Sequence, residues 1–519
     1  MRTSARVGRL LFVFTLGVYL CSAGGSLTTT DAVVTFDVTR SIVQHGSVAL
    51  SGNLLGMEAH RGRDGRYYSP FGIGQSLYNI PFYLSARLVE AATNIRLGKT
   101  DTLEKAFVAL GQTLIGAAIV WQAFHLALAL TGDLAASALA ALLLAFASIL
   151  WPYARFGFNQ PLACWALLGA VHHALAGARR NQAGRLAVAG AWLAASLLTR
   201  HEMALAALPL AAWLSLDGRP SRAARARRVA AFGAPVLGGI AAWLVFNAVR
   251  FGNPLDPGYL RDPIPAFGSP VLPGIAALLF SPAASLFLYS PVALLGVIGL
   301  CRMIRTGDRS AGWLLASIVT LFLVFYGSFG NWMGGRSYGS RYLVVVVPYC
   351  VIGCAALLAP WSPARRSRAF AVLMSAGMLV QVPGVLVDYS KVSQEVAASE
   401  GRFTTEERQW QWRASPLVLN ARALGRALPD NIAYAAGWRA APAVERAAPD
   451  SDRGFAQRFS FSLDLWWLYL YYLRVLPRAA LAAIAVAFLV FVAFCIRRLT
   501  RLLAAGETIA NARAGCESG

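Results

Sequence analysis

Residues 24–40 read Gly24-Gly-Ser-Leu-Thr-Thr-Thr-Asp31-Ala-Val-Val-Thr-Phe-Asp37-Val-Thr-Arg40. They follow the first apolar run of the chain, and Asp31 and Asp37 are the only acidic residues before Glu58. A carboxylate just beyond a membrane helix can take a proton from an acceptor hydroxyl or amine. The alternative is that both aspartates are solvated loop residues. Their isolation and position make a chemical role at the membrane surface a second hypothesis, which the residues alone do not favour over the first.

The composition predicts an integral membrane protein. The 519 residues are 57% hydrophobic, the mean hydropathy is +0.53, and only 14% of residues are charged. A soluble protein of this length has about a quarter of its residues charged. The net charge of +22 comes almost entirely from arginine, and the arginines cluster in short loops between apolar runs. This pattern marks the cytoplasmic face of a membrane protein and argues against nucleic-acid binding.

The apolar runs predict about twelve membrane crossings in an all-α bundle. Residues 186–216 are too long for one helix and are interrupted by Thr199-Arg200-His201-Glu202, so we expect two short helices that meet at this polar tip. The other expected spans are 10–25, 105–130, 134–153, 158–177, 229–250, 272–300, 311–329, 340–360, 369–388 and 478–496.

The orientation depends on residues 76–93, a short segment that carries Asn79, Pro81 and Arg87. If this segment lies on the outer surface and does not cross, every arginine cluster and both termini face the cytoplasm, as the positive-inside rule requires. Residues 26–104 and 389–477 then lie outside. This orientation places both termini in the cytoplasm, and we expect a multi-pass protein of a bacterial inner membrane.

We expect three parts in the chain. Residues 1–388 form a transmembrane catalytic module, with its first outer loop at 26–104. Residues 389–477 form a small outer cap, and residues 478–519 hold the last helix and a cytoplasmic tail. The first helix is expected to stay uncleaved, because so many spans follow it.

Two outer loops combine aromatic residues with arginines. The first reads Arg66-Tyr67-Tyr68-Ser-Pro-Phe-Gly72, in which the tyrosines can hold a sugar face and the arginine a phosphate. The second reads Gly334-Gly-Arg336-Ser-Tyr338-Gly-Ser-Arg341-Tyr342, which suits a phosphate held by backbone N–H groups and guanidinium. The alternatives are an ordinary turn in the first loop and a structural turn with a snorkelling Arg341 in the second.

Two more polar tips are expected on the outer face. Arg155 precedes Asn159-Gln160-Pro161, and Arg200 is followed by His201-Glu202. Charges at membrane depth are costly, so Arg200 pairing with Glu202 is favoured slightly over a ligand role. Arg155 and Arg200 remain candidate substrate-binding residues. A metal site is not expected at Cys350 and Cys354, which share a helix face but lack nearby histidine or acidic partners.

This arrangement of motifs resembles the GT-C superfamily of polytopic glycosyltransferases that use polyprenyl-phosphate-linked sugars. Protein O-mannosyltransferases and the lipid A aminoarabinose transferase belong to it. The resemblance rests on Asp31 after the first helix, a short helix over 35–44 that ends at Gly46, the loop 67–72 and the Gly334–Tyr342 motif. It covers nearly the whole chain in order.

The resemblance implies an inverting glycosyltransferase. It places Asp31 as the general base, with Asp37 as a reserve base or a sugar-orienting group. It further implies that Arg341, together with Arg336 or Arg66, meets the phosphate of the donor. Members often carry an acidic residue in the loop around 153–161, sometimes for a divalent metal. This chain has Asn159-Gln160 there, so a metal cofactor is not supported.

The expected partners are a polyprenyl-phosphate-linked sugar as donor and a lipid, glycan or protein as acceptor. Two other functions stay open. An O-antigen-ligase-like transferase would place its chemistry on arginines of the 389–477 loop, namely Arg402, Arg408 or Arg413. A transporter or flippase of lipid-linked sugars would need ionisable groups at mid-bilayer, and the sequence has essentially none away from helix ends.

Overall fold

The computed structural model describes residues 2–51, 59–93, 101–259, 267–268, 270–330, 332–335, 337–388, 409–444 and 459–517, with the backbone alone at 2 and 507–517. The chain is 76% helical. The described residues contain one sheet of two short antiparallel strands, β1 (His60–Arg61) and β2 (Tyr67–Tyr68), in which His60 lies opposite Tyr68. The prediction of an all-α membrane fold is confirmed.

The helices follow one another along the chain, some with short connections and others, such as α2 and α3, with longer ones. They are α1 (Arg2–Ser22), α2 (Thr30–His45), α3 (Gly74–Thr93), α4 (Thr102–Thr131), α5 (Leu134–Phe146), α6 (Leu150–Tyr153), α7 (Gln160–Arg179), α8 (Ala183–Thr199), α9 (Ala207–Leu216), α10 (Arg222–Phe251), α11 (Val271–Phe280), α12 (Leu286–Tyr289), α13 (Pro291–Thr306), α14 (Arg309–Gly327), α15 (Val347–Leu358), α16 (Pro363–Leu386), α19 (Pro416–Ala436), α21 (Trp466–Tyr472) and α22 (Arg478–Glu517). The described residues also form the 3-10 helices η2 (His201–Ala206), η4 (Arg341–Val345) and η5 (Trp412–Ala414).

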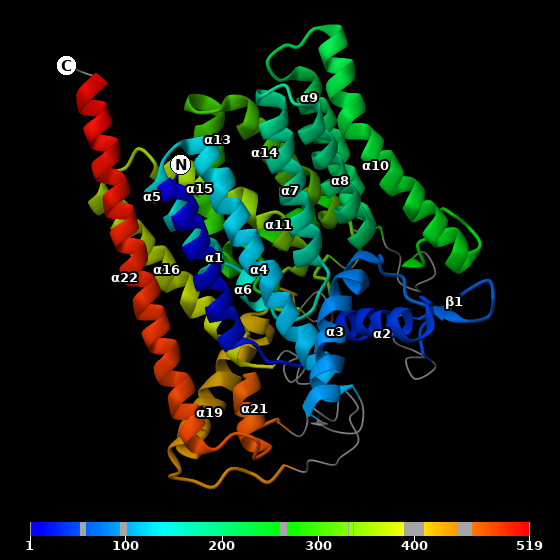
Figure 1. The fold of residues 1–519 in the computed structure, drawn as a ribbon, viewed down its shortest axis with the longest axis vertical. Helices are drawn as coiled ribbons and strands as arrows, with labels where there is room; N and C mark the ends of the chain where they lie inside the picture. Colours follow the sequence, from blue (N-terminus) through cyan, green and yellow to red (C-terminus); the bar gives the residue numbers. More distant parts are fainter. Residues whose placement is uncertain are drawn as a thin grey trace.

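Within the described residues, seven helices are long and apolar enough to cross a membrane: α1, α4, α7, α10, α14, α16 and α22. Five shorter apolar helices of 10–17 residues accompany them. The chain is therefore a multi-pass membrane protein. Both termini lie at the same end of the bundle, which we call the terminal end, whereas α2 and α3 lie at the opposite end, the α2 end (Figure 1).

Two expected spans differ from the structure in an informative way. Residues 186–216 form α8 and the η2–α9 pair, which meet at an extended Arg200 as predicted. Residues 272–300, predicted as one span, are broken into α11, α12 and α13. The breaks follow Phe280 and Tyr289, where serine side chains and prolines interrupt the helical hydrogen bonding.

Residues 76–93 form α3, a helix with Pro81 in its interior. Among the described residues it is not one of the seven helices that meet the length and hydropathy required of a span. It packs between α2 and α4 and buries Gln75, Ser76 and Asn79. These polar residues bond to Gln112 on α4 and to the backbone of α2. Hydrogen bonds therefore fix α2 and α3 to the bundle.

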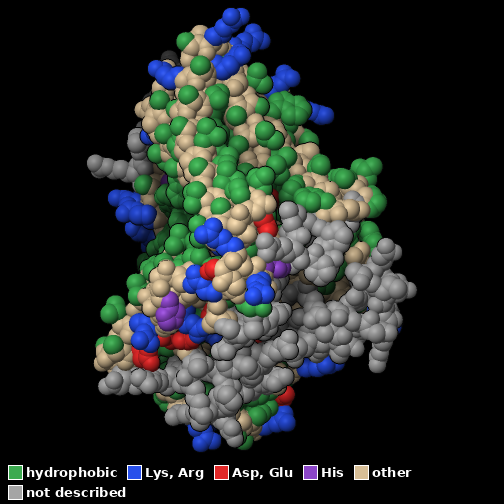
Figure 2. Space-filling view, turned by 90° about the vertical axis from the view of Figure 1, so that its right-hand side faces the viewer, with side chains coloured by type: hydrophobic (Ala, Val, Ile, Leu, Met, Phe, Trp, Pro, Cys, Tyr) green, Lys and Arg blue, Asp and Glu red, His purple; other side chains and the backbone are tan. Residues whose placement is uncertain are grey.

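The lipid-facing surface is visible on α10. Figure 2 shows a broad apolar surface between basic side chains at the terminal end and mixed charges nearer the α2 end. On α10 the exposed apolar residues include Leu237, Val245 and Val249. The exposed arginines of the preceding turn and the first turns of α10 are Arg219, Arg222, Arg225 and Arg227. An apolar helix with a basic end at one side is typical of a membrane span.

In the interior of the bundle, the backbones of neighbouring helices approach one another closely. Helices α13 and α15 cross at glycines, and a Cβ built on Gly299 would lie 1.8 Å from the carbonyl oxygen of Gly353. Small residues that let two backbones touch are a common packing solution in membranes, where lipid removes the hydrophobic driving force between helices. This rigid core carries the loops of the α2 end.

The described parts of 389–477 also lie at the α2 end, where Figure 1 shows α19 and α21 beneath the bundle. They hold a small apolar cluster of their own, centred on Tyr434, Phe459, Tyr469 and Tyr472. The cluster is joined to the bundle through hydrogen bonds from Trp466 and Trp467 to the last turn of α1. The three-part division of the chain stays a prediction.

Candidate active site

Helix α2 places Asp31 at the exit of the first membrane helix. The hydroxyl of Thr29 accepts a hydrogen bond from the amide of Ala32 at 3.2 Å and caps the helix. Gly46, with φ of 61°, ends it in the left-handed conformation that glycine adopts without strain. The predicted helix over 35–44 is thus present and longer. Asp31 lies in its first turn, where the helix dipole favours a negative charge.

Asp31 is buried and forms an ion pair with Arg341. The Nη1 of Arg341 donates to both carboxylate oxygens, at 3.0 and 2.9 Å. Asp31 is 4% exposed, and the guanidinium lies over the rings of Phe158 (4.9 Å) and Tyr342 (5.3 Å). The structure therefore brings together the predicted base and the predicted phosphate ligand. The aromatic walls lower the local dielectric and strengthen the attraction.

A second ion pair, between Arg200 and Glu202, lies next to the ring of Tyr342. Arg200 bonds to Glu202 at 2.5 Å and to the side-chain oxygen of Asn159 at 2.7 Å. The hydroxyl of Tyr326 donates to Glu202 at 3.0 Å, and its ring stacks on Tyr342 at 4.8 Å. The expected pairing of Arg200 with Glu202 is present. Arg200 thus holds the aromatic wall beside Arg341.

The loop between α6 and α7 packs directly on the start of α2. The hydroxyl of Thr29 donates to the carbonyl of Phe156, and Gly157 adopts a φ of 75°. A Cβ on Gly157 would lie 2.8 Å from the Cβ of Ala32. This glycine is required both by its backbone conformation and by the close approach of α2, and it sets Phe158 beneath Arg341.

Arg155 is held by the segment before α21 and does not reach Asp31. Its Nη2 donates to the carbonyl oxygen of Asp464 at 2.8 Å and to the carboxylate of the same residue. Asp464 also accepts from the hydroxyl of Tyr469. The Nε and Nη1 of Arg155 are buried without a hydrogen-bond partner in the described part of the chain. The candidate ligand Arg155 thus binds the segment before α21.

We expect Arg155→Met to destabilise the protein by about 3–5 kcal/mol, because it leaves the buried Asp464 carboxylate without its cation. The double variant Arg155→Met/Asp464→Leu should recover most of this loss, since it removes both charges together. The midpoint of thermal unfolding in detergent measures the effect. Equal destabilisation by the single and double variants would contradict the coupling.

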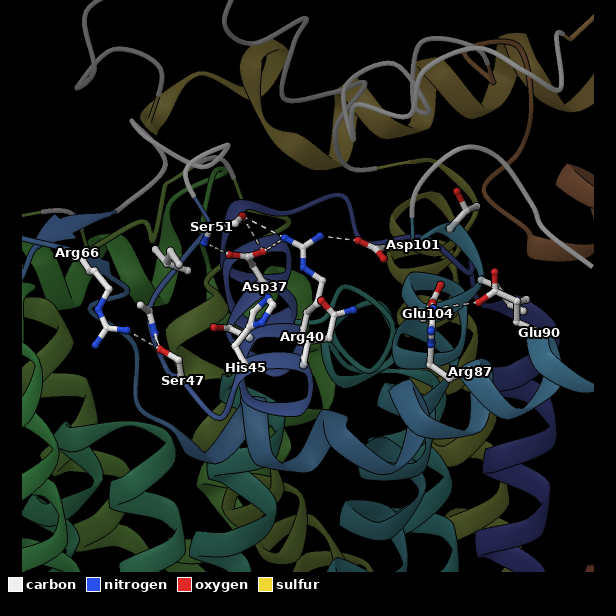
Figure 3. A pocket seen from close by; sticks show the side chains of 16 residues that line it. Asp37, Arg40, His45, Ser47, Ser51, Arg66, Arg87, Glu90, Asp101 and Glu104 are labelled. Carbon is white, nitrogen blue, oxygen red and sulfur yellow. Dashed lines mark hydrogen bonds and ion pairs between the residues drawn. The ribbon is translucent and has the colours of Figure 1, made fainter.

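Asp37 faces away from Asp31. It forms an ion pair with Arg40 and accepts hydrogen bonds from the amide and hydroxyl of Ser51, and Arg40 reaches Asp101 at 2.5 Å. These groups line a polar cavity of about 700 Å³ between α2 and the start of α4 (Figure 3). Asp31 does not line it. The structure therefore gives Asp37 a position apart from the Asp31–Arg341 pair.

The hairpin of β1 and β2 carries Arg66, Tyr67 and Tyr68. Tyr68 is buried against Phe251, and hydrogen bonds from its hydroxyl and from Arg66 lower the pKa of Asp64 to about 2. Because the folded pKa lies below the unfolded one, the ionised Asp64 stabilises the folded protein. This stabilisation is complete above the unfolded pKa of an aspartate, about 3.9, and is lost as the pH falls toward 2. Tyr67 is 36% exposed, and Arg66 lines the cavity near Asp37. Of the three residues, Arg66 therefore lies at the cavity near Asp37, and Tyr67 and Tyr68 do not line it.

Of the remaining candidate residues, Tyr338 and Arg413 belong to the described part of the chain and the other three do not. Tyr338 is 1% exposed, donates to the carbonyl of Val380 and packs edge-on against Tyr289, so its ring has no open face for a sugar. Arg413 of the ligase-like alternative is exposed on η5. Three candidates lie outside the described residues, namely Arg336, Arg402 and Arg408.

Several residues of the site carried no strong sequence signal. Phe158, Tyr326 and Asp464 contribute contacts from three separate segments, and each resembles an ordinary apolar or loop residue in its own surroundings. In the described ranges, no group of three or more histidine, cysteine or acidic residues is placed to hold a metal. The site is instead built from paired charges and aromatic rings.

Comparisons with known proteins agree with this architecture. No protein-family model and no curated protein matches the chain. Among solved structures, it is similar to ArnT from Cupriavidus metallidurans in the apo state, with a TM-score of 0.52 and 15% identity over 82% of this chain and 79% of that one. It is also similar to the apo oligosaccharyltransferase of Archaeoglobus fulgidus, with a TM-score of 0.44 and 11% identity over 80% and 60%. The chain therefore shares the all-helical GT-C membrane fold of ArnT.

Proposed function

We propose that this protein is an inverting membrane glycosyltransferase that moves a sugar from a polyprenyl-phosphate carrier to an acceptor hydroxyl. The observation that carries the proposal is the buried Asp31–Arg341 ion pair at the exit of α1. It joins a base and an anion-binding cation in one place. The GT-C fold supports the same reaction class.

The reaction that this pair can perform is a single displacement. The acceptor oxygen attacks the anomeric carbon, and its proton passes to the Asp31 carboxylate. The bond between the anomeric carbon and the phosphate oxygen breaks, and its electron pair stays on the lipid phosphate. Arg341 stabilises the phosphate as its charge grows. One displacement inverts the anomeric configuration.

The ion pair also explains how two buried charges are stabilised in the absence of substrate. A buried carboxylate and a buried guanidinium are each costly alone, and each neutralises the other. A donor phosphate that approaches Arg341 competes with Asp31 for the guanidinium and so makes the carboxylate available to the acceptor. We propose that the α2 end faces outward and the arginine-rich terminal end faces the cytoplasm.

The test is a transfer assay on the purified protein in lipid nanodiscs. A radiolabelled sugar is supplied either on polyprenyl phosphate or as the nucleotide sugar, with membrane lipids and glycans as acceptors. Transfer from the lipid donor alone, with inversion at the anomeric carbon, is the expected result. Transfer from the nucleotide sugar, or retention of configuration, would contradict the proposal. Export of the intact lipid-linked sugar without transfer would favour the transporter alternative.

A further inference from the structure

A second large cavity lies at the terminal end of the bundle, opposite the end that carries Asp31. Its volume is about 1210 Å³, and among the described residues its lining comes from seven helices: α1, α4, α5, α13, α15, α16 and α22. Figure 1 shows the N-terminus together with α5, α13 and α15 at this end. The cavity is therefore separate from the candidate active site.

The lining of this cavity is amphipathic. Leu134, Met303 and Leu503 contribute apolar side chains, whereas Thr3 and Thr306 contribute hydroxyl groups. A small soluble anion makes no use of leucine side chains, and a hydrocarbon makes no use of hydroxyl groups. The lining therefore suits a ligand that has both an apolar part and a polar part.

The charges in the cavity favour an anion. Asp133 caps α5 and pairs with Arg366 at 2.7 Å. Asp308 caps α14 and pairs with Arg179. Arg302 also lines the cavity, is exposed, and has no acidic partner within the described part of the chain. An anion would thus find an available guanidinium at Arg302, while each of the two carboxylates is neutralised by an arginine.

Further arginines surround the cavity. Arg6 on α1, Arg305 on α13 and Arg501 on α22 are exposed, and each lies within one turn of a residue that lines the cavity. Charges of one sign gathered on a surface raise the local concentration of ions of the opposite sign. The surroundings of the cavity therefore attract the same kind of ligand as Arg302.

Membrane lipid can reach this cavity from the side. Only 11% of the most apolar stretch of α22 and 39% of that of α1 are buried in the protein, so both helices face the bilayer. Along α22, the lining residue Leu503 comes just after the exposed Arg497, Arg498 and Arg501. Arginines at the end of a membrane helix mark the level of the lipid headgroups. The cavity therefore lies where acyl chains and headgroups meet.

We infer that this cavity binds a phospholipid with an anionic headgroup, whose phosphate pairs with Arg302 and whose acyl chains lie against the leucine side chains. Basic pockets between membrane helices bind such headgroups in other proteins. The bound lipid contacts both α13 and α22, two helices that line the cavity from distant parts of the chain. Because it binds the folded state alone, it stabilises the protein.

The experiment titrates the purified full-length protein in a nonionic detergent with two lipids that have the same acyl chains. Dioleoylphosphatidylglycerol is anionic, and dioleoylphosphatidylcholine has no net charge. We expect the anionic lipid to bind at least about tenfold more tightly in native mass spectrometry. It should also raise the midpoint of thermal unfolding by about 3 °C at saturation. Equal affinity for the two lipids would overturn the inference.

Glycerol 3-phosphate distinguishes a lipid from a free phosphate, because it carries the phosphate without acyl chains. It should leave the unfolding midpoint unchanged. If glycerol 3-phosphate raises the midpoint as much as the anionic lipid does, the cavity binds a soluble phosphate and the assignment to a lipid is wrong.

Two variants test the position of the site. Arg302→Gln should weaken binding of the anionic lipid about tenfold, the effect of one lost charge-assisted contact. Thr306→Trp should weaken it by a similar factor, because the indole occupies the cavity. Both residues are exposed, so neither change should alter the unfolding midpoint without lipid.

Arg225→Gln on α10 is the matched control, since it removes an exposed arginine that does not line the cavity. It should leave the affinity for the anionic lipid unchanged. If Arg225→Gln weakens binding as much as Arg302→Gln does, the lipid is attracted by the general surface charge and the inference fails. These outcomes do not depend on whether the protein transfers a sugar.

Discussion

Asp31→Asn is expected to lower kcat for sugar transfer about 10³-fold, within the range that general-base catalysis contributes. The amide keeps the size of the side chain and its place in the first turn of α2, but it cannot accept the acceptor's proton. Affinity for the donor should be retained or increased, because Arg341 loses the carboxylate that competes with the phosphate. Single-turnover transfer and equilibrium binding of polyprenyl phosphate measure the two effects separately.

Two other aspartates serve as controls for this result. Asp430→Asn removes an exposed carboxylate on α19 that pairs with Arg439, and it should leave both rate and affinity unchanged. Asp37→Asn should lower thermal stability, because Arg40 and Ser51 lose a shared acceptor, while kcat changes little. If kcat falls more for Asp37→Asn than for Asp31→Asn, Asp37 rather than Asp31 is the general base.

Arg341→Lys is expected to lower kcat/KM about 10²-fold, and Arg341→Gln about 10³-fold. Lysine keeps the charge that balances Asp31, but it replaces a planar guanidinium that stacks on Phe158 and Tyr342 with a compact ammonium. Unlike the Asp31 variant, both should also weaken binding of polyprenyl phosphate by about tenfold or more. The affinity for undecaprenol, which lacks the phosphate, should not change.

Arg439→Lys is the matched control, since Arg439 also pairs with an aspartate but is exposed. It should leave kcat/KM and lipid affinity unchanged. If Arg341→Lys binds polyprenyl phosphate as tightly as the wild-type protein, Arg341 does not hold the phosphate. Its role would then be limited to positioning Asp31.

Much of the local structure was predictable because it depends on neighbouring residues. The cap at Thr29 and the glycine at Gly46 define α2 from signals within one or two turns. The break at Arg200 follows from four polar residues inside an apolar run. The prediction of one span over 272–300 was wrong, because serines and prolines interrupt a run whose hydropathy alone resembles that of a single span.

The candidate site was only partly predictable. Asp31 and Arg341 could each be singled out because a charge beside a membrane helix is unusual. Tyr68, Tyr338 and Arg155 were also singled out, yet the fold buries all three in contacts with the protein itself. An aromatic or arginine in a loop has the same sequence signature whether it binds a ligand or a neighbouring segment.

The sequence by itself determined the class of the protein, the approximate positions of most of its long helices and the placement of Asp31 after the first helix. These features follow from hydropathy, periodicity and caps, which are local. Only the tertiary structure decided that Asp31 meets Arg341, 310 positions away, and that Arg155 meets Asp464, 309 positions away. Such pairs depend on how distant helices pack and turn, and no local pattern contains that information.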